Sequence, residues 1–192
     1  MFKNLYKKCL DLAGHKSSKY YLAIVSFVES SFFPIPPDII LIPMVLANRI
    51  KAWLYASICT ISSVIGGIAG YFIGFFFYNS IGIKIVQYYS LENLFSSFES
   101  SYNDYGILIV LGAGFTPFPF KFITIASGLF GLNLPLFISV AFFARGLRFF
   151  LVAGLIKLFG NFIKNLIDRY FNIIATLFFL LLIGSFILIK YL

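Results

Sequence analysis

Charged residues are scarce in this chain of 192 residues: they make up 11% of it, whereas hydrophobic residues make up 60%. The mean hydropathy of +0.96 excludes an ordinary soluble domain. Histidine occurs once (His15) and cysteine twice (Cys9 and Cys59), so neither a disulfide framework nor a cysteine–histidine metal site is predicted. No spacing of Ser, His and Asp typical of a catalytic triad is present either. We therefore predict a protein that is not an enzyme and that binds no metal and no cofactor.

The apolar residues gather in runs long enough to cross a membrane. Residues 52–78 contain no charge, residues 135–156 contain only Arg145 and Arg148, and residues 170–190 are almost entirely apolar. A hydrocarbon core of ~30 Å is spanned by about 20 helical residues. All three runs are therefore predicted to be transmembrane helices, and the fold class is an all-α integral membrane protein.

Basic residues border the first apolar segment, residues 20–48, on both sides. The amphipathic N-terminal segment 1–19 carries five lysines, and Arg49 and Lys51 follow the apolar segment. Because basic flanks favour the cytoplasmic side, both ends of residues 20–48 and the N-terminus are predicted to be cytoplasmic. The net charge of +8 then reflects topology, and no nucleic-acid partner is predicted.

Prolines divide this first segment. Pro34, Pro36 and Pro37 separate residues 20–33 from residues 38–48, and proline ends helices. At 1.5 Å per residue the two pieces would be helices of about 21 and 16 Å, each near half a bilayer. Residues 20–48 are thus predicted to form a re-entrant hairpin that returns to its own side of the membrane.

A similar pattern recurs 83 positions later. Pro34 and Pro36 fall on Pro117 and Pro119, and Asp38 falls on Lys121. Residues 105–130 are therefore predicted to be a second re-entrant hairpin, followed by the 135–156 helix as the first is followed by the 52–78 helix. Because one crossing separates the hairpins, the second enters from the opposite face, which is the inverted-repeat arrangement of secondary transporters.

Two further patterns concern packing. Residues 84–103 carry an apolar stripe, which predicts an amphipathic helix on the membrane surface. Within the 52–78 helix, small residues recur every fourth position, which predicts close helix contact. The stripe is Tyr88, Leu91, Phe95, Phe98 and Tyr102, and the small residues are Ser62, Gly66, Gly70 and Gly74.

The few charges inside the apolar zone mark a candidate site. Charged residues within membrane segments are rare and usually functional, and here they are Glu29, Asp38, Lys121, Arg145 and Arg148. Two acids against three bases leave one positive charge, which suits an anionic group such as a phosphate. We expect these five residues to bind substrate and protons. The alternative is a purely structural network of ion pairs with one lysine that reaches toward the surface.

The motifs also resemble a known family. Glu29-x4-Pro34-x-Pro36-x-Asp38 is similar to the signature of the DedA family of membrane proteins, also called the VTT or SNARE-associated domain family. "GFTPFPFKFITIASGLFGLN", followed by "ARGLRFFLVAGL", resembles its YqaA-like branch. The resemblance covers residues 20–160. It implies a multi-pass protein of the bacterial inner (plasma) membrane with two opposed re-entrant hairpins. It also implies proton-dependent translocation of a lipid, either a phospholipid or a polyprenyl phosphate.

The residue match to that family is incomplete. Glu29 and Asp38 match its two functional acids, but Gly114 stands where the family has an arginine, and Lys121 lies one residue after a second family arginine. Substrate identity therefore does not transfer. Two other functions stay open: a proton-coupled carrier of a small ion or solute, and a membrane assembly factor without transport. A groove open to lipid would favour the lipid transporter, and an enclosed pocket the solute carrier.

Overall fold

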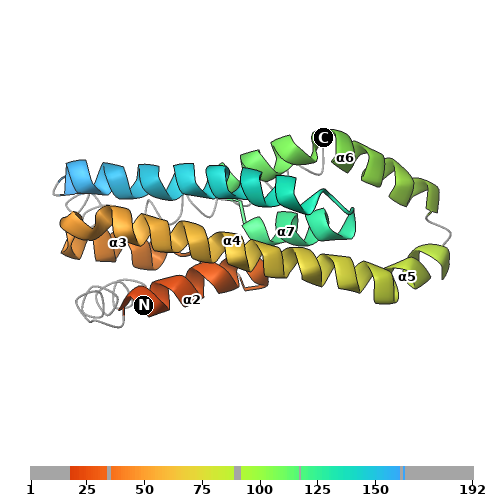
Figure 1. Cartoon of the computed structure of the whole chain (residues 1–192), viewed down its shortest axis with the longest axis horizontal. Coiled ribbons are helices and arrows are strands. Elements are labelled where there is room, and N and C mark those ends of the chain that lie inside the picture. The colour runs from red at the N-terminus through yellow and green to blue at the C-terminus, as the bar shows by residue number, and fades with distance from the viewer. Residues whose placement is uncertain (1–17, 34–35, 89–91, 117, 161, 163–192) are drawn as a thin grey trace.

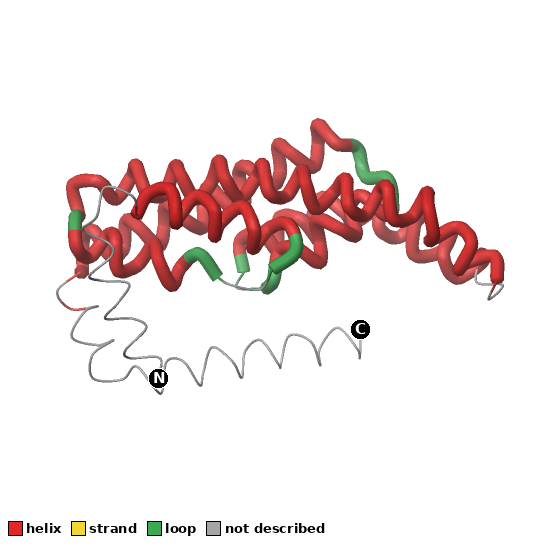
Figure 2. Tube along the Cα trace, turned by 90° about the horizontal axis from the view of Figure 1, so that it is seen from below, coloured by secondary structure: helices red, strands yellow, loops and turns green. Residues whose placement is uncertain are grey.

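All secondary structure in the described part of the chain is helical. A computed structural model describes residues 18–33, 36–88, 92–116, 118–160 and 162, and Figure 2 shows only helices and loops among them. Among the described residues, two helices are long and apolar enough to cross a membrane, Arg49–Ser80 and Leu134–Gly160. The prediction of an all-α chain with transmembrane helices at 52–78 and 135–156 agrees with these findings. Two predicted segments lie outside the described residues: the N-terminal segment 1–19, except for residues 18 and 19, and the helix at 170–190.

The first half begins with two short helices on either side of the proline-rich stretch. They are α2 (Ser18–Ser31) and α3 (Asp38–Ala47). Pro37 precedes α3 with φ −65°, the value that the pyrrolidine ring imposes, and its carbonyl accepts a hydrogen bond from the Leu41 N–H at 2.9 Å. Figure 1 shows that α3 runs back toward the end of the molecule from which α2 starts. A 3₁₀ turn, η1 (Arg49–Lys51), then leads into α4 (Ala52–Phe77).

The second half also ends in a short helix followed by a long apolar helix (Figure 1). A π-helical turn, η2 (Tyr78–Gly82), and the short α5 (Ile83–Tyr88) lead to α6 (Glu92–Phe115), α7 (Phe120–Leu129) and the Leu134–Gly160 helix. The turn after α7 needs glycine, because Gly131 has φ +65°. There the Leu132 N–H donates to the Ser127 carbonyl at 2.9 Å, the hydrogen bond of a Schellman motif.

The element bounds follow the offset seen in the sequence. Adding 83 to the bounds of α3 gives 121–130, and α7 is Phe120–Leu129. Adding 83 to the bounds of α4 gives 135–160, and the corresponding helix is Leu134–Gly160. The bounds of the last two helices of each half therefore recur, whereas α6, with 24 residues, is longer than α2, with 14. The re-entrant position of the two hairpins and the inverted repeat with respect to a membrane stay predictions.

The segment between the halves differs from its prediction. An amphipathic helix at 84–103 and a hairpin beginning at 105 were expected, but α5 ends at Tyr88 and α6 runs from Glu92 to Phe115 without interruption. No proline lies inside α6, and isolated glycines cost a helix only about 1 kcal/mol each, so nothing breaks it near residue 104. The predicted stripe is also divided: Tyr102 is buried, whereas Tyr88 and Phe98 are exposed.

Aromatic rings connect the two halves at the α5 end of the bundle. Tyr78 stacks on Phe95 with ring centroids 4.7 Å apart, and Phe130 lies 5.3 Å from Phe95 and 5.1 Å from Tyr102. The Tyr102 hydroxyl also lies 2.8 Å from the Ser127 hydroxyl. These contacts attach α6 to η2 and to the end of α7.

The small residues of α4 allow backbones to approach closely on two sides. A Cβ added to Gly66 would lie 2.1 Å from the Phe27 carbonyl oxygen of α2, and one added to Gly74 would lie 2.0 Å from the Ile125 carbonyl oxygen of α7. Gly128 of α7 is equally restricted, with the Tyr71 carbonyl oxygen 1.8 Å from its added Cβ. The predicted close contact along this helix face is therefore present, with α2 and α7 packed against successive turns of α4.

Replacement of Gly66 by Ala should destabilise the protein. The methyl group would meet backbone rather than a movable side chain, so α2 must shift, and we expect a loss of about 1–3 kcal/mol in the free energy of unfolding. Thermal unfolding in detergent measures the effect. Gly112→Ala is the matched control, because a Cβ at Gly112 meets nothing within 4 Å. An unchanged melting temperature for Gly66→Ala would contradict this packing.

Candidate functional site

The central feature of the site is a guanidinium with no solvent exposure. Arg145, on the Leu134–Gly160 helix, has 0% exposed surface. Its Nη2 donates to Glu29 Oε2 at 2.5 Å, and its Nε donates to Ser63 Oγ at 2.6 Å. The guanidinium carbon lies 5.1 Å from the centre of the Phe120 ring and 4.7 Å from that of Phe149. Two ring faces and an ion pair therefore stabilise the buried positive charge.

Two hydroxyl groups complete a closed ring of hydrogen bonds around this ion pair. Ser30 Oγ donates to Glu29 Oε2 at 3.1 Å and lies 2.6 Å from Ser63 Oγ. Arginine nitrogens only donate and a carboxylate only accepts. The Ser63 proton must therefore point to Ser30, and the Ser30 proton to Glu29. The ring fixes the direction of every hydrogen bond as long as Glu29 is ionised.

A second ion pair lies one helical turn away and is more accessible. Arg148 Nη2 pairs with Asp38 Oδ2, and its Nη1 donates to the Thr116 carbonyl at 2.7 Å. The side chains of Arg148 and Asp38 are 12% and 19% exposed, compared with 0% and 9% for Arg145 and Glu29. Arg148 thus links the first residue of α3 to the residue that follows α6.

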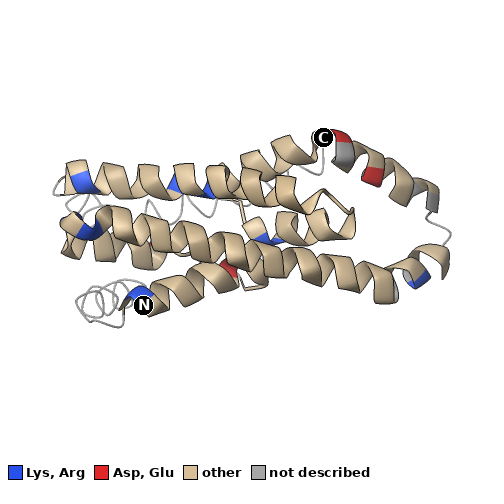
Figure 3. Cartoon of the chain, in the orientation of Figure 1, with Lys and Arg blue, Asp and Glu red and all other residues tan. Residues whose placement is uncertain are grey.

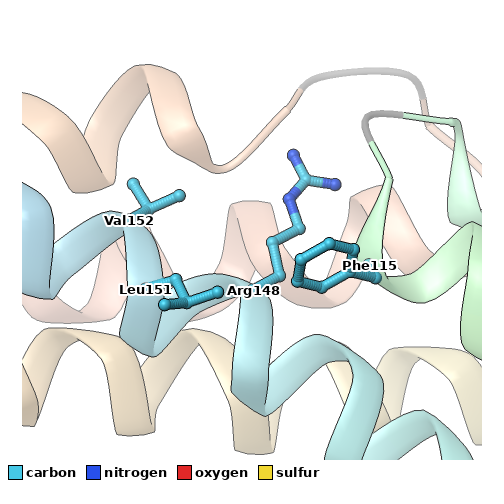
Figure 4. Close-up of a pocket in the computed structure, with 4 residues that line it drawn as sticks. All are labelled: Phe115, Arg148, Leu151 and Val152. Atoms are coloured by element: carbon cyan, nitrogen blue, oxygen red, sulfur yellow. The ribbon is translucent and has the colours of Figure 1, made fainter.

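Arg148 of this second pair lines a small pocket. The pocket has a volume of about 180 Å³ and is lined by Phe115, Arg148, Leu151 and Val152. Figure 4 shows the Arg148 side chain extending away from its helix past the Phe115 ring, with Leu151 and Val152 farther along the same helix. A cation beside three apolar side chains is suited to a ligand with an anionic head and an apolar tail.

Each ion pair has one polar atom without a partner among the described residues. The atoms are Asp38 Oδ1 and Arg145 Nη1, and both are buried. An unsatisfied buried polar group costs about 1–3 kcal/mol, and such groups are rare unless a site needs them. The two atoms are an acceptor and a donor that a polar ligand group or a proton can satisfy.

Apolar packing isolates the charges from both ends of the bundle. One buried cluster contains Cys59 and Phe149, and the other contains Tyr71 and Phe120. Ser63 lies between the clusters on α4, and Arg145 lies between them on the Leu134–Gly160 helix. Arg145 therefore packs against one aromatic ring from each cluster.

The five predicted site residues do not all meet. Glu29, Asp38, Arg145 and Arg148 form the two pairs, whereas Lys121 contacts no carboxylate that the structure describes. Its Nζ lies 3.4 Å from the Phe32 carbonyl oxygen and 5.1 Å from the centre of the Phe122 ring. Whether these residues bind substrate or protons stays a prediction.

The predicted hairpin prolines lie around this site as far as they are described. Pro36 and Pro37 precede α3, and Pro119 precedes α7 with φ −63°. Pro34 and Pro117 lie outside the described residues.

Sequence reasoning missed the neutral partners. Ser30, Ser63, Phe120 and Phe149 touch the guanidinium or its partner, yet none was predicted as a site residue. For the two serines the sequence offered a signal: both lie in apolar segments, Ser30 directly after Glu29, and buried hydroxyl groups need hydrogen-bond partners. The aromatic rings offered none, since phenylalanine occurs 26 times in the chain.

Metal binding has no support in the described part of the chain. No group of three His, Cys, Asp or Glu side chains there is arranged to hold a metal ion. The chemistry available at the site is ionic and hydrogen-bonding.

Comparison with known proteins identifies the family of the chain. A family model described as VTT domain matches residues 34–158, which include Asp38 and both arginines of the site. The chain belongs to the VTT domain (DedA) family. Its membership and its two long apolar helices together indicate a membrane protein.

Two relatives of this VTT protein are similar over most of their length. A protein of Haemophilus influenzae, described as uncharacterized, is 38% identical over 155 residues, which cover 81% of this chain and 80% of the relative. A Histophilus somni protein with a similar description is 32% identical over 155 residues, 81% of each chain. No solved structure matches the VTT protein significantly.

Glu29→Gln should destabilise the VTT protein by about 3–5 kcal/mol, because it leaves the Arg145 charge buried without its counter-ion. Arg145→Met should cost a similar amount, and the double variant should lose less than the sum of the two. Unfolding in detergent, run as a double-mutant cycle, measures the coupling. Glu99→Gln on the exposed face of α6 is the control for the same chemical change. Additive losses would mean that the pair contributes no coupling energy.

Proposed function

We propose that this VTT protein is a transporter that moves an anionic or zwitterionic lipid across the bilayer and couples this movement to protons. Membership of the VTT family is consistent with a transporter-like role. The observation that carries the proposal is the presence of two ion pairs in the apolar zone. Glu29–Arg145 and Asp38–Arg148 join the two helices beside the first proline-rich break to one long helix of the second half.

The Asp38–Arg148 pair is the proposed site for the lipid head group. Of the two arginines, Arg148 has the more exposed side chain, and it lines the pocket. A guanidinium binds a phosphate with paired hydrogen bonds. Phe115, Leu151 and Val152 supply apolar surface beside it for the first carbons of the lipid chain. This combination favours a phospholipid or a polyprenyl phosphate.

Competition for Arg148 provides the proposed coupling. While Arg148 pairs with Asp38, its guanidinium is the counter-ion of the carboxylate. A phosphate that binds the guanidinium in its place leaves the Asp38 carboxylate without its cation, on a side chain that is only 19% exposed. A proton that neutralises this carboxylate would then remove an unpaired negative charge. Entry of the head group and uptake of a proton would occur together, and the pair would form again when both leave.

The proposed setting is the bacterial inner membrane, with the N-terminus in the cytoplasm and the two helix pairs α2–α3 and α6–α7 as re-entrant hairpins. The lengths of the apolar helices support this proposal: α2 has 14 residues and α3 and α7 have 10 each, about 21 and 15 Å. In α6, which has 24 residues in all, the apolar part that would enter the membrane is Asp104–Phe115. Interrupted backbone at such depth must be covered by protein or line a wet cavity. The close contacts of α2 and α7 with α4 supply such cover.

The size of the pocket favours a second candidate, a proton-coupled carrier of a small anion. At about 180 Å³ the pocket holds a head group or a small solute but no whole lipid. The lipid proposal requires the tail to remain in the bilayer beside the pocket. Transport assays with a fluorescent phospholipid and with a labelled small anion separate the two candidates.

Arg148→Gln should slow phospholipid translocation at least tenfold, and Asp38→Asn should abolish its response to an imposed pH gradient. The first change removes the proposed phosphate ligand, and the second removes the titrating group. Proteoliposomes with a head-group-labelled phospholipid and a membrane-impermeant quencher measure both rates. Lys84→Gln, on the exposed surface of α5, is the control. Equal wild-type rates with and without the gradient would refute proton coupling, and normal translocation by well-folded Arg148→Gln would refute the head-group site.

Single cysteines test the proposed topology in a background without Cys9 and Cys59. Residues Lys19 and Ile50 are exposed, and they flank the first predicted hairpin. Cysteines at both positions should react with a membrane-impermeant reagent from the cytoplasmic side, and a cysteine at the exposed Ser97 should react from the other side. Labelling of positions 19 and 50 from opposite sides would show that residues 20–48 cross the membrane.

A further inference from the structure

The two ion pairs of the candidate site share one aromatic ring. The Arg145 guanidinium carbon lies 4.7 Å from the centre of the Phe149 ring, and that of Arg148 lies 5.9 Å from the same centre. Figure 3 shows blue ribbon near the middle of the Leu134–Gly160 helix, where these two arginines lie three residues apart. One ring therefore contacts the cation of the enclosed pair and the cation of the accessible pair.

Packing from several helices holds this ring in place. Phe149 has no exposed surface and belongs to the buried cluster that also contains Leu22 of α2, Leu41 of α3 and Cys59 of α4. Close packing keeps core side chains in defined rotamers. The ring is therefore a fixed support for both guanidinium groups.

The ring of Phe120 allows a comparison within the same site. It is also fully buried, and its centre lies 5.1 Å from the Arg145 guanidinium carbon. It belongs to the other buried cluster and stacks on Phe137 with ring centroids 6.5 Å apart. Among the described contacts between cations and rings, Phe120 therefore takes part in one, with Arg145, and Phe149 in two.

Contact with a ring leaves a guanidinium able to bind an anion at the same time. The attraction acts between the positive charge and the negative potential of the ring face, so it needs no hydrogen-bond acceptor. Arg148 indeed pairs with Asp38 and donates to the Thr116 carbonyl while it contacts Phe149. When a phosphate replaces Asp38, as in the proposed function, the contact with Phe149 can persist. The ring is thus a support of Arg148 that both states share.

We propose that Phe149 is a positioning residue for Arg148 and that its ring couples the two ion pairs. The positive charges of Arg145 and Arg148 interact with the same ring, so a change of partner at Arg148 alters the support that the ring gives to Arg145. The enclosed pair therefore responds to a ligand at the accessible pair. That Arg148 binds a lipid head group rests on the proposed function, whereas the coupling through the ring does not.

Fluorination tests the electrostatic part of this role without removing the ring. Trifluorophenylalanine at position 149 keeps nearly the shape of phenylalanine and weakens the negative potential of the ring faces. Unfolding of the full chain in detergent should show an equilibrium constant about fivefold larger, the factor equivalent to about 1 kcal/mol. The same replacement at positions 120 and 137 should have a smaller and the smallest effect, because the described ring contacts there are with one cation and none.

A double-mutant cycle isolates the contribution of Arg148. The combined change Asp38→Asn/Arg148→Met removes the accessible pair as a whole. In that background the effect of fluorination at position 149 should fall about twofold, whereas the effect at position 120 should stay the same. Equal effects at 149 in the two backgrounds would overturn the proposal. Should the combined variant fail to fold, positions 149 and 120 of the otherwise unchanged chain decide, because equal effects there would refute the second cation.

The same fluorine atoms report on a ligand at the accessible pair. Dihexanoyl phosphatidic acid, a short-chain lipid with an anionic head group, is titrated onto the full chain in neutral detergent and followed by fluorine NMR. We expect a saturable shift of the resonance at position 149 and a smaller one at position 120. Equal shifts at both positions would contradict the role of Phe149. Shifts at neither would refute the head-group site of the proposed function, and the unfolding cycle then decides the coupling through the ring by itself.

Discussion

A buried guanidinium must find its hydrogen bonds inside the protein, and in this fold that requirement governs the arrangement of three helices. Arg145 has no exposed surface, so its charge is stabilised by Glu29 from α2, by Ser63 from α4 and by two aromatic rings. Such contacts need short distances between helix axes. The glycines of α4 provide them by removing side chains where α2 and α7 approach.

The two ion pairs differ in what surrounds them. Hydroxyl groups and rings enclose Glu29–Arg145, and its hydrogen-bonded ring satisfies nearly every polar atom. Asp38–Arg148 lies beside the pocket and includes a main-chain acceptor, the carbonyl of Thr116. The enclosed pair is suited to holding the halves together, and the more accessible pair is suited to exchanging partners. Both arginines come from one helix, three residues apart, so one helix face carries both properties.

Much of this was accessible from the sequence because lipid restricts the choices. Long apolar runs predicted the two long helices, and the rarity of charge in the apolar zone singled out five residues, of which four form the two ion pairs. The assignment of Glu29 to Arg145 and Asp38 to Arg148 was not accessible, because it depends on how α2 and α3 sit against a distant helix. The continuous α6 was also missed, since the apolar stripe in 84–103 was given more weight than the lack of a helix breaker. Lys121 belongs to the same apolar zone, but its position on α7 directs it to a carbonyl oxygen instead of a carboxylate.

The uninterrupted α6 gives the molecule a mechanical element. Its 24 residues form a rod of about 36 Å, and Thr116 follows directly after its last residue. The hydrogen bond from Arg148 to the Thr116 carbonyl therefore holds the C-terminal end of α6. Near its N-terminal end, Phe95 packs against the rings of Tyr78 and Phe130. The two ends of α6 are thus held by different interactions, one by a hydrogen bond from the Asp38–Arg148 pair and the other by ring contacts. A stiff helix between them connects the ion pair mechanically to the α5 end of the bundle.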